Sequence, residues 1–233
     1  PIELIVSQLD DLWLRDTAPT FVKNAHNTLT AIDFNFNGWG NKQSHQHDRK
    51  VAQFIAQQTN TPLMNSRITL EGGCFEVDGE GTAIMTESCI INDNRNPAIS
   101  RIAIEEELKT LLGLKNIIWL KGIKGKDITD GHTDFYARFA RPGVVVISRD
   151  TDTTSYNYTI TQENIDILAS ARDAQGRAPT TFILDTPWEI SEQYPIAEFA
   201  AGYVGYYVCN GAVIMQKFGD EAADSMAKSL LST

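Results

Sequence analysis

The stretch ITDGHTDFYAR, residues 128–138, contains one of only four histidines in the chain, with a carboxylate two positions away on either side. Alternation in its second half predicts a strand, in which side chains two positions apart point to the same face. His132 and Asp134 would then project together, with Tyr136 and Arg138 continuing the row. An imidazole beside a carboxylate is suited to proton transfer near neutral pH. The stretch is the first candidate for a functional site, although an isolated His-x-Asp pair is more often structural.

Around this stretch the chain repeats one unit, in which two strands, a helix and a further strand recur at intervals of roughly 50–60 residues. Each unit is too small to bury its own sheet, so we expect the units to stack around an axis. The repeat looks cut at both ends of the chain. The predicted strands cover residues 2–6, 20–23, 29–36, 67–70, 74–77, 82–91, 116–120, 132–138, 144–148, 180–184, 200–209 and 212–216, and the predicted helices start at Asp48, Ser100, Thr161 and Asp220.

The composition, with 42% hydrophobic and 21% charged residues, is that of an ordinary globular protein. A net charge of −10 argues against nucleic acid as a partner and favours a small cationic ligand. No apolar run approaches the roughly 20 residues of a membrane span. Cys74, Cys89 and Cys209 are widely spaced in apolar surroundings, which predicts reduced, buried thiols and a cytoplasmic location. A glycosylation acceptor at residues 157–159 leaves export open.

Further polar clusters lie at predicted strand ends or in loops. They are Asp11-x-Trp13-x-Arg15-Asp16, Leu70-Glu71-Gly72-Gly73, Asn94-Arg95-Asn96-Pro97 and, nearer the C-terminal end, YVCNGAVI (207–214) and Phe218-Gly219-Asp220. Together with Asp130-Gly131-His132-x-Asp134, these clusters resemble the agmatine deiminase and bacterial-type peptidylarginine deiminase family, a part of the guanidino-group-modifying superfamily. The resemblance covers nearly the whole chain, in the family's order.

The resemblance implies an α/β fold: a pentein-like α/β propeller of ββαβ modules with pseudo-fivefold symmetry, here incomplete. Residues 1–233 would form a single deiminase-like domain, truncated at both ends. The implied reaction is hydrolysis of a guanidinium to a ureido group and ammonia, with agmatine giving N-carbamoylputrescine as the leading case. The family implies no cofactor and no metal.

The resemblance also implies roles for individual residues. Asp16 and Asp134 would bind the guanidinium N–H groups through paired, charge-assisted hydrogen bonds. His132 would protonate the leaving ammonia and then activate water, and Trp13 would pack against the planar cation. The remaining candidates for substrate binding are Glu71, Asp11, Arg15, Gly72, Gly73, Asp130 and Asn210.

The family's nucleophile is a cysteine in a C-terminal glycine-rich loop, whose thiolate forms a thiouronium intermediate. This sequence contains no such loop, so a molecule limited to these 233 residues is predicted not to turn over substrate. Cys74 follows the Glu71-Gly72-Gly73 cluster, but its alternation with Phe75 and Val77 predicts a packed core residue. Cys89 and Cys209 are likewise predicted to lie in the core.

Three alternatives stay open. A deiminase acting on free or peptidyl arginine, giving citrulline, would share the same motifs. A metal-dependent hydrolase could use His132, Asp134, Asp16 and Glu71 as ligands, a set that suits Mn or Mg better than Zn. A catalytically inactive remnant would bind a cationic ligand or, through open strand edges, pair with another chain as a homo-oligomer.

Several candidates also have a purely structural interpretation. Asp11 fits a solvated loop, and Arg15 is equally suited to holding its carboxylate neighbours in place. Residues 94–97 predict a turn before the second helix, and residues 105–107 predict a solvated helix face. Asn210, followed by a glycine, predicts a hairpin turn.

Overall fold

The computed structural model describes residues 4–191 and 201–232 and contains four small sheets. In each of the first three, two antiparallel strands are followed by a third that runs parallel to the second, after a connecting helix. The strands are β1 (Thr20–Lys23), β2 (Leu29–Asp33) and β3 (Leu63–Asn65); β4 (Phe75–Val77), β5 (Thr82–Thr86) and β6 (Asn116–Leu120); β7 (Ala137–Arg141), β8 (Val144–Arg149) and β9 (Thr180–Asp185); and the antiparallel pair β10 (Tyr207–Cys209) and β11 (Ala212–Ile214). The ββαβ module predicted from the sequence is confirmed.

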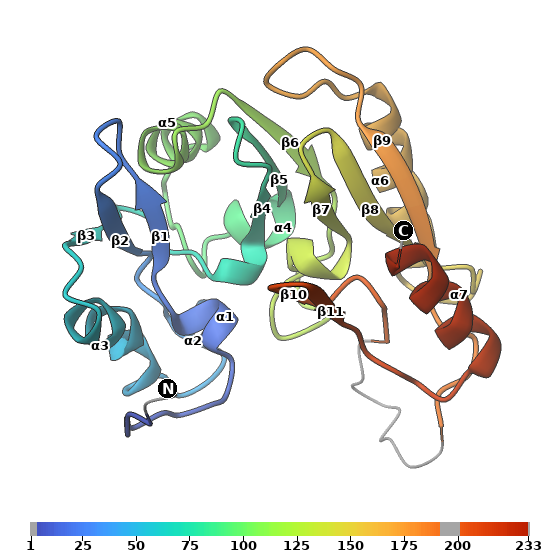
Figure 1. The fold of residues 1–233 in the computed structure, drawn as a ribbon, viewed down its shortest axis with the longest axis horizontal. Helices are drawn as coiled ribbons and strands as arrows, with labels where there is room; N and C mark the ends of the chain where they lie inside the picture. The colour runs from blue at the N-terminus through green and yellow to red at the C-terminus, as the bar shows by residue number, and fades with distance from the viewer. Residues whose placement is uncertain (1–3, 192–200, 233) are drawn as a thin grey trace.

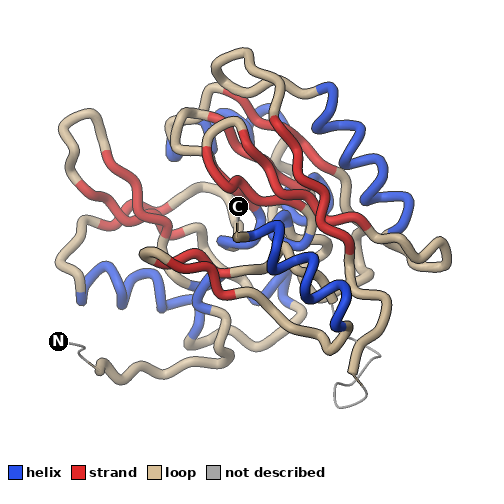
Figure 2. The backbone as a smooth tube through the Cα atoms, turned by 45° about the vertical axis from the view of Figure 1, so that its right-hand side comes forward, coloured by secondary structure: helices blue, strands red, loops and turns tan. Residues whose placement is uncertain are grey.

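The long helices connect or follow these strands. They are α3 (Val51–Gln58), α5 (Arg101–Leu112), α6 (Tyr158–Ser170) and α7 (Glu221–Leu231), and the short helical turns are α1 (Leu14–Thr17), α2 (Gly38–Asn41), η1 (Asp48–Lys50), η2 (Gly72–Cys74), α4 (Glu87–Ile90) and η3 (Thr133–Phe135). The sheets follow one another round an arc, with β1, β4 and β7 on the inner side of their sheets (Figure 1). Helix α3 packs on β2, α6 on β8 and α7 on β9, and Figure 2 shows the helices running beside the strands.

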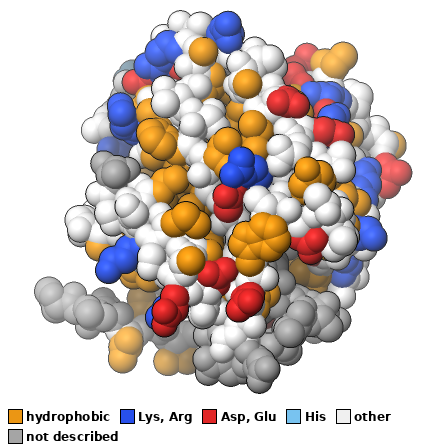
Figure 3. Space-filling view, turned by 90° about the vertical axis from the view of Figure 1, so that its right-hand side faces the viewer, with side chains coloured by type: hydrophobic (Ala, Val, Ile, Leu, Met, Phe, Trp, Pro, Cys, Tyr) orange, Lys and Arg blue, Asp and Glu red, His pale blue; other side chains and the backbone are white. Residues whose placement is uncertain are grey.

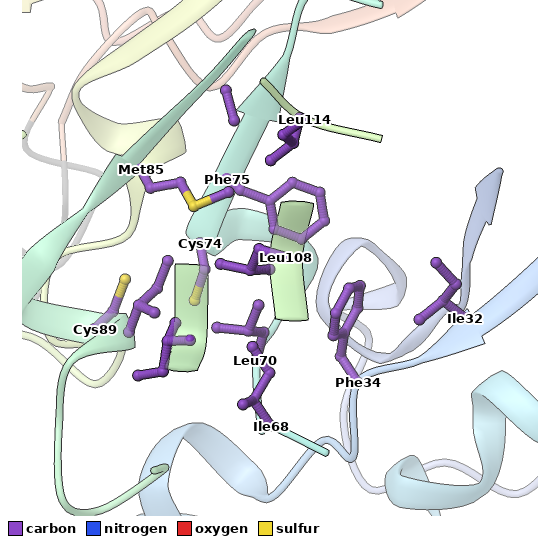
Figure 4. Close-up of a cluster of buried hydrophobic side chains, with 13 residues drawn as sticks. Ile32, Phe34, Ile68, Leu70, Cys74, Phe75, Met85, Cys89, Leu108 and Leu114 are labelled. Atoms are coloured by element: carbon purple, nitrogen blue, oxygen red, sulfur yellow. The ribbon is translucent and has the colours of Figure 1, made fainter. Parts of the chain in front are cut away.

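Each hydrophobic core joins neighbouring modules. The first cluster contains Ile32 of β2 together with Leu108 of α5 (Figure 4). The second contains Ile84 of β5 and Leu168 of α6, and the third joins the β7–β9 sheet to α7. On the side of the molecule at the right of Figure 1, hydrophobic side chains run down the middle, with acidic ones among and below them (Figure 3). Because the modules share their cores, their loops are held at fixed positions relative to one another.

The predicted helix ends are confirmed where a capping residue defines them. The side chain of Ser100 accepts a hydrogen bond from the backbone N–H of Ala103 (3.2 Å) at the start of α5, and Gly113 ends that helix in the left-handed region (φ 67°). The side chain of Asp220 caps α7 in the same way, accepting from the N–H of Ala223 at 3.0 Å.

Several predicted strands are wrong. Residues 4–6 are unpaired, and Leu4 and Val6 are more than nine-tenths exposed; residues 2 and 3 lie outside the described residues. Residues 67–70 form no strand, because the parallel partner of β2 is Leu63–Asn65. The strand predicted over 82–91 ends at Thr86, where α4 begins. At residues 67–70, the alternation predicted the burial of Ile68 and Leu70 but not the pairing of strands.

Further corrections concern the second half of the chain. Residues 133–135 form the turn η3 rather than a strand, and β7 begins at Ala137. Helix α6 begins before Thr161 and ends well before Gly176, while β10 covers only the end of the range predicted over 200–209, whose first residue lies outside the described part. Glu107, predicted to be solvated, is buried and paired with Arg67.

The three thiols also differ from one another. Cys74 and Cys89 are fully buried in the first core, as predicted, whereas Cys209 is only half-buried on β10. None of the helices described within residues 4–191 and 201–232 combines the length and apolar character needed to cross a bilayer.

Candidate active site

His132 lies immediately before η3 and is almost completely buried, with 2% of its surface exposed. Three carboxylates from separate segments surround its ring. Nδ1 lies 3.9 Å from Oδ1 of Asp16 and 3.8 Å from Oδ1 of Asp134, and Nε2 lies 3.4 Å from Oε2 of Glu71 without hydrogen-bond geometry. The side chains that the sequence singled out in α1, before η2 and in η3 thus converge on one imidazole.

The carboxylates decide the charge of this imidazole. Burial alone would lower the pKa of His132, but the fields of Asp16, Glu71 and Asp134 outweigh burial and raise it to about 10. His132 is therefore an imidazolium at neutral pH. A buried cation among carboxylates can donate a proton to a leaving group.

On the Nε2 side, Glu71 belongs to a buried ionic network. Arg95 donates from Nε to both Glu71 oxygens (2.8 and 3.0 Å) and from Nη1 to Asp130 (2.8 Å), and Lys42 lies 2.7 Å from Asp130. We call Glu71, Arg95, Asp130 and Lys42 the inner network. Burial raises the pKa of Glu71, but His132 and Arg95 outweigh it and hold the pKa below its ordinary value.

The inner network also fixes the turn before His132. Asp130 (φ 63°) and Gly131 (φ 82°) are both left-handed, so the chain reverses tightly there. The Asp130 oxygens accept from Lys42, Arg95, Asn94 and the N–H of Gly125, which hold its pKa at about 2 despite burial. Because both oxygens are engaged within the protein, Asp130 holds this loop in place.

Arg95 was missed by sequence reasoning, which interpreted residues 94–97 as a turn. Its side chain is fully buried, and Nη2 also donates to the backbone carbonyl of Thr129 (2.9 Å). One signal could have found it: a site with buried Glu71 and Asp130 needs a buried cation, and Arg95 is the one arginine among the recognised motifs without a role.

On the Nδ1 side, the carboxylates are less shielded. Asp16 accepts from the N–H of Gly73 (2.9 Å) and from Nε1 of Trp39 (3.0 Å). Asp134, whose side chain is 22% exposed, lies 3.3 Å from Nε of Arg15, and Arg15 also pairs with Glu76. We call Asp16, Asp134, Arg15 and Glu76 the outer network.

The outer network continues to solvent and to the next sheet. Burial raises the pKa of Asp134, and the charges of Asp16 and Glu76 add to the rise. Glu76 also accepts from Nε of Arg138 (3.0 Å), and the exposed Trp13 begins the helical turn that carries Asp16. An aromatic ring and two carboxylates next to solvent can receive a planar cation.

Two glycines allow the segments to approach each other closely. A Cβ atom on Gly73 would lie 2.3 Å from Nδ1 of His132, and one on Gly72 would lie 1.9 Å from the carbonyl oxygen of Arg15. The glycines thus admit the imidazole and the Arg15 backbone, and their part in substrate binding stays a prediction.

Two predicted site residues lie apart from His132. Asp11 accepts from the side chain of Gln43 (2.9 Å) and its own N–H is bound by Asp48. Asn210 is exposed in the two-residue turn between β10 and β11, followed by Gly211 with φ 79°. No contact within the described residues joins either to His132, and the hairpin turn predicted at Asn210 is confirmed.

The donor atoms do not suit a metal ion. The predicted ligands cannot converge, because Asp16 and Asp134 face Nδ1 of His132 while Glu71 faces Nε2. Glu71, Cys74 and His132 do offer donor atoms within 4.8 Å of one another. However, Arg95 already neutralises Glu71, and the Cys74 thiol donates to Glu71 at 2.8 Å. Burial raises the pKa of this thiol well above its ordinary value, which keeps it protonated.

Comparisons with known proteins identify the family of the chain. The family model for the Porphyromonas-type peptidyl-arginine deiminase matches residues 2–233. An agmatine deiminase of Medicago truncatula is 34% identical, covering 99% of this chain and 70% of the relative, and one of Pseudomonas putida is 32% identical, covering 99% and 68%. The chain spans about two thirds of the length of the curated relatives it matches.

Solved structures give the same result for the fold. An agmatine deiminase of Enterococcus faecalis superposes with a TM-score of 0.88 at 29% identity, covering 97% of this chain and 68% of that one. An agmatine deiminase of C. jejuni with substrate bound gives a TM-score of 0.86 at 29% identity, covering 99% and 67%. The repeated modules are therefore those of the pentein fold.

Proposed function

Because the chain belongs to the Porphyromonas-type peptidyl-arginine deiminase family, we propose that the space beside His132 binds a guanidino compound for hydrolysis. Agmatine is the first candidate, since relatives at 32% and 34% identity are named agmatine deiminases. The products would be a ureido compound, N-carbamoylputrescine in the case of agmatine, and ammonia.

One observation carries this proposal: two carboxylates, Asp16 and Asp134, face the same nitrogen of a buried imidazole. A guanidinium keeps its charge at neutral pH and presents N–H donors in one plane, which match a pair of carboxylates. Such binding would orient the guanidinium carbon beside His132. Trp13, 53% exposed, would pack against the cation or its aliphatic chain.

Binding of a cation would also prepare His132 for both of its roles. Its pKa of about 10 depends on the negative charges of Asp16 and Asp134. A bound guanidinium offsets those charges, so the pKa of His132 would fall towards neutrality. His132 could then give its proton to departing ammonia and afterwards accept a proton from the attacking water.

The carbon-attacking group would be a thiolate, which displaces ammonia to form a thiouronium that water then hydrolyses. The thiols in this chain do not suit that role. Cys74 is buried and bound to Glu71, Cys89 is buried beside Thr86, and Cys209 lies on β10. We therefore propose that these 233 residues alone bind a guanidino substrate without turning it over.

Calorimetric titration with agmatine and with arginine tests the proposal. We expect agmatine to bind, and Asp134→Asn to weaken it roughly tenfold or more because a charged acceptor is lost. The exposed Asp166 on α6 provides a charge-matched control, Asp166→Asn, with unchanged binding. Equal binding by both variants would refute the assignment, and preference for arginine would favour the arginine-specific alternative. Sustained ammonia release by this chain would refute the predicted inactivity.

A further inference from the structure

A second cavity lies next to the His132 site, among the loops that follow β8 and β9. Its volume is about 490 Å³. Neither His132 nor Asp16 nor Glu71 lines it, whereas Phe135, whose ring centroid lies 6.5 Å from that of His132, does. Its lining is aromatic and acidic, with Phe135, Tyr136, Tyr156 and Trp188 beside Asp127, Asp150 and Asp152.

The carboxylates at this cavity retain capacity to accept hydrogen bonds. Oδ1 of Asp150 accepts from the N–H of Asp152 (3.0 Å), and Oδ1 of Asp152 accepts from the N–H of Thr154 (2.8 Å). Within the described residues, neither Oδ2 oxygen has a hydrogen-bond partner. The Oδ2 atoms of Asp150 and Asp152 are thus available to a hydrogen-bond donor inside the cavity or at its mouth.

A buried hydroxyl at the cavity points to a ligand with hydrogen-bonding groups. Ser148 is only 4% exposed and lines the cavity, yet its hydroxyl has no hydrogen-bond partner in the described part of the chain. In addition, the ammonium of Lys126 already lies 5.6 Å from the ring centroid of Tyr156. The protein's own ammonium therefore already lies beside this ring, so a ligand cation would meet the carboxylates and the remaining aromatic side chains.

Nearby carboxylates make the electrostatic potential around Tyr156 negative. Burial raises the pKa of Tyr156, and the charges of Asp127 and Asp150 add to that rise. Asp127 itself is occupied by its own turn, since it accepts from the N–H groups of Thr129 and Gly131. Asp150 and Asp152 are consequently the carboxylates available to a ligand.

We propose that this cavity binds a primary alkylammonium group, with the carboxylates of Asp150 and Asp152 receiving the ammonium and the aromatic walls packing on the methylene chain. Two sources offer this chemistry: the amine end of a substrate whose guanidinium lies beside His132, or a free alkylamine. The first source rests on the function proposed above, whereas the second does not.

The probe is 1,4-diaminobutane, titrated calorimetrically into the full chain, with 1-butanol as the uncharged comparison. We expect the diamine to bind, 1-butanol not to bind, and the Asp150→Asn/Asp152→Asn variant to weaken binding roughly tenfold. Asparagine keeps the Oδ1 acceptor that each loop contact uses, so the loop is preserved. Glu163→Gln/Asp166→Asn removes the same charge from exposed positions of α6 and should bind as the wild type does.

A second variant guards against local misfolding. Trp188 is 71% exposed and contacts Asp220 only through its backbone N–H, so Trp188→Ala should fold normally and bind the diamine roughly threefold more weakly. Failure of the diamine to bind at millimolar concentration, or equal binding by the Asp150→Asn/Asp152→Asn variant, would overturn the proposal.

Agmatine distinguishes the two sources. Competition between agmatine and the diamine, together with weaker agmatine binding to the Asp150→Asn/Asp152→Asn variant, would assign the cavity to the amine end of the substrate. Simultaneous binding of the two would assign it to a free alkylamine. The guanidino proposal fails by a separate result: agmatine binding that the Asp134→Asn substitution leaves unchanged.

Discussion

The inner network on one side of His132 and the outer network on the other use similar residues in opposite ways. In the inner network, Arg95 and Glu71 are completely buried, and every charge meets an opposite charge within the protein. In the outer network, Asp16 receives only neutral donors besides His132, and Arg15, 42% exposed, is shared between Asp134 and Glu76. Negative charge is balanced on the first side and in excess on the second.

This difference in charge balance suits the inner network to holding His132 in place and the outer network to binding a cation. A buried carboxylate without a partner costs several kcal/mol, so the inner network must be complete in the free protein. A carboxylate near solvent is stabilised by water until a cation replaces that water. Accordingly, the inner network would fix the imidazole and the outer network would receive the substrate, and each prediction below tests one side against the other.

The largest effect is expected from breaking the inner network. Arg95→Met leaves Glu71 and Asp130 buried without their common partner, and should lower the free energy of unfolding by about 3–5 kcal/mol. Arg101→Met, at an arginine that pairs with Glu87 and Glu105 on the surface, should cost about 1 kcal/mol or less. Urea denaturation of both variants measures the difference, and equal losses would show that burial does not distinguish the two sets of ion pairs.

His132 itself should give the next largest effect, seen as a pH dependence. Its folded-state pKa, about 10, is raised above the ordinary value of 6.5, so its stabilising contribution is complete below pH 6.5 and lost as pH rises towards 10. The advantage of the wild type over His132→Asn in free energy of unfolding should shrink by about 4 kcal/mol between these pH values. Other groups titrate in both proteins, so comparison with the variant isolates the contribution of His132. An advantage independent of pH would contradict a protonated His132.

A smaller effect is expected in the outer network at Glu76, which acts on Asp134 through Arg15. Glu76→Gln removes a charge that raises the pKa of Asp134 and frees Arg15 to compete with a cationic ligand. Agmatine binding should weaken roughly threefold, and the pH below which binding is lost should move downwards. Glu80→Gln, at an exposed glutamate paired with Arg177, should change neither. A weaker affinity with an unshifted pH profile would indicate a merely structural role.

Sequence patterns predicted the modules well where a local rule determines the structure. Ser100 and Asp220 were identified as caps because a short polar side chain at a helix start has one dominant use. The strand predicted at 67–70 was wrong because alternation indicates burial, whereas pairing depends on which segment lies beside β2, here Leu63–Asn65. Likewise, His132 and Asp134 do lie together, but through the turn η3 rather than a shared strand face.

The site residues that belong to short sequence motifs were predicted, and those outside such motifs or without an assigned role in them were not. Asp16, Glu71, His132 and Asp134 were identified from short clusters, and the structure brings them together. Arg95 and Glu76 were missed because their roles depend on partners more than 20 positions away along the chain, which one sequence does not show. Long-range charge balance is therefore the part that needed three-dimensional information.

The most direct test of this account is an NMR titration of His132 in the free protein and with agmatine bound, using His132→Asn to assign the signal. The account predicts that the free imidazole titrates near pH 10 and that agmatine moves its pKa towards neutrality, because the bound cation offsets Asp16 and Asp134. A pKa near 6.5 in the free protein, or a pKa that agmatine leaves unchanged, would contradict it.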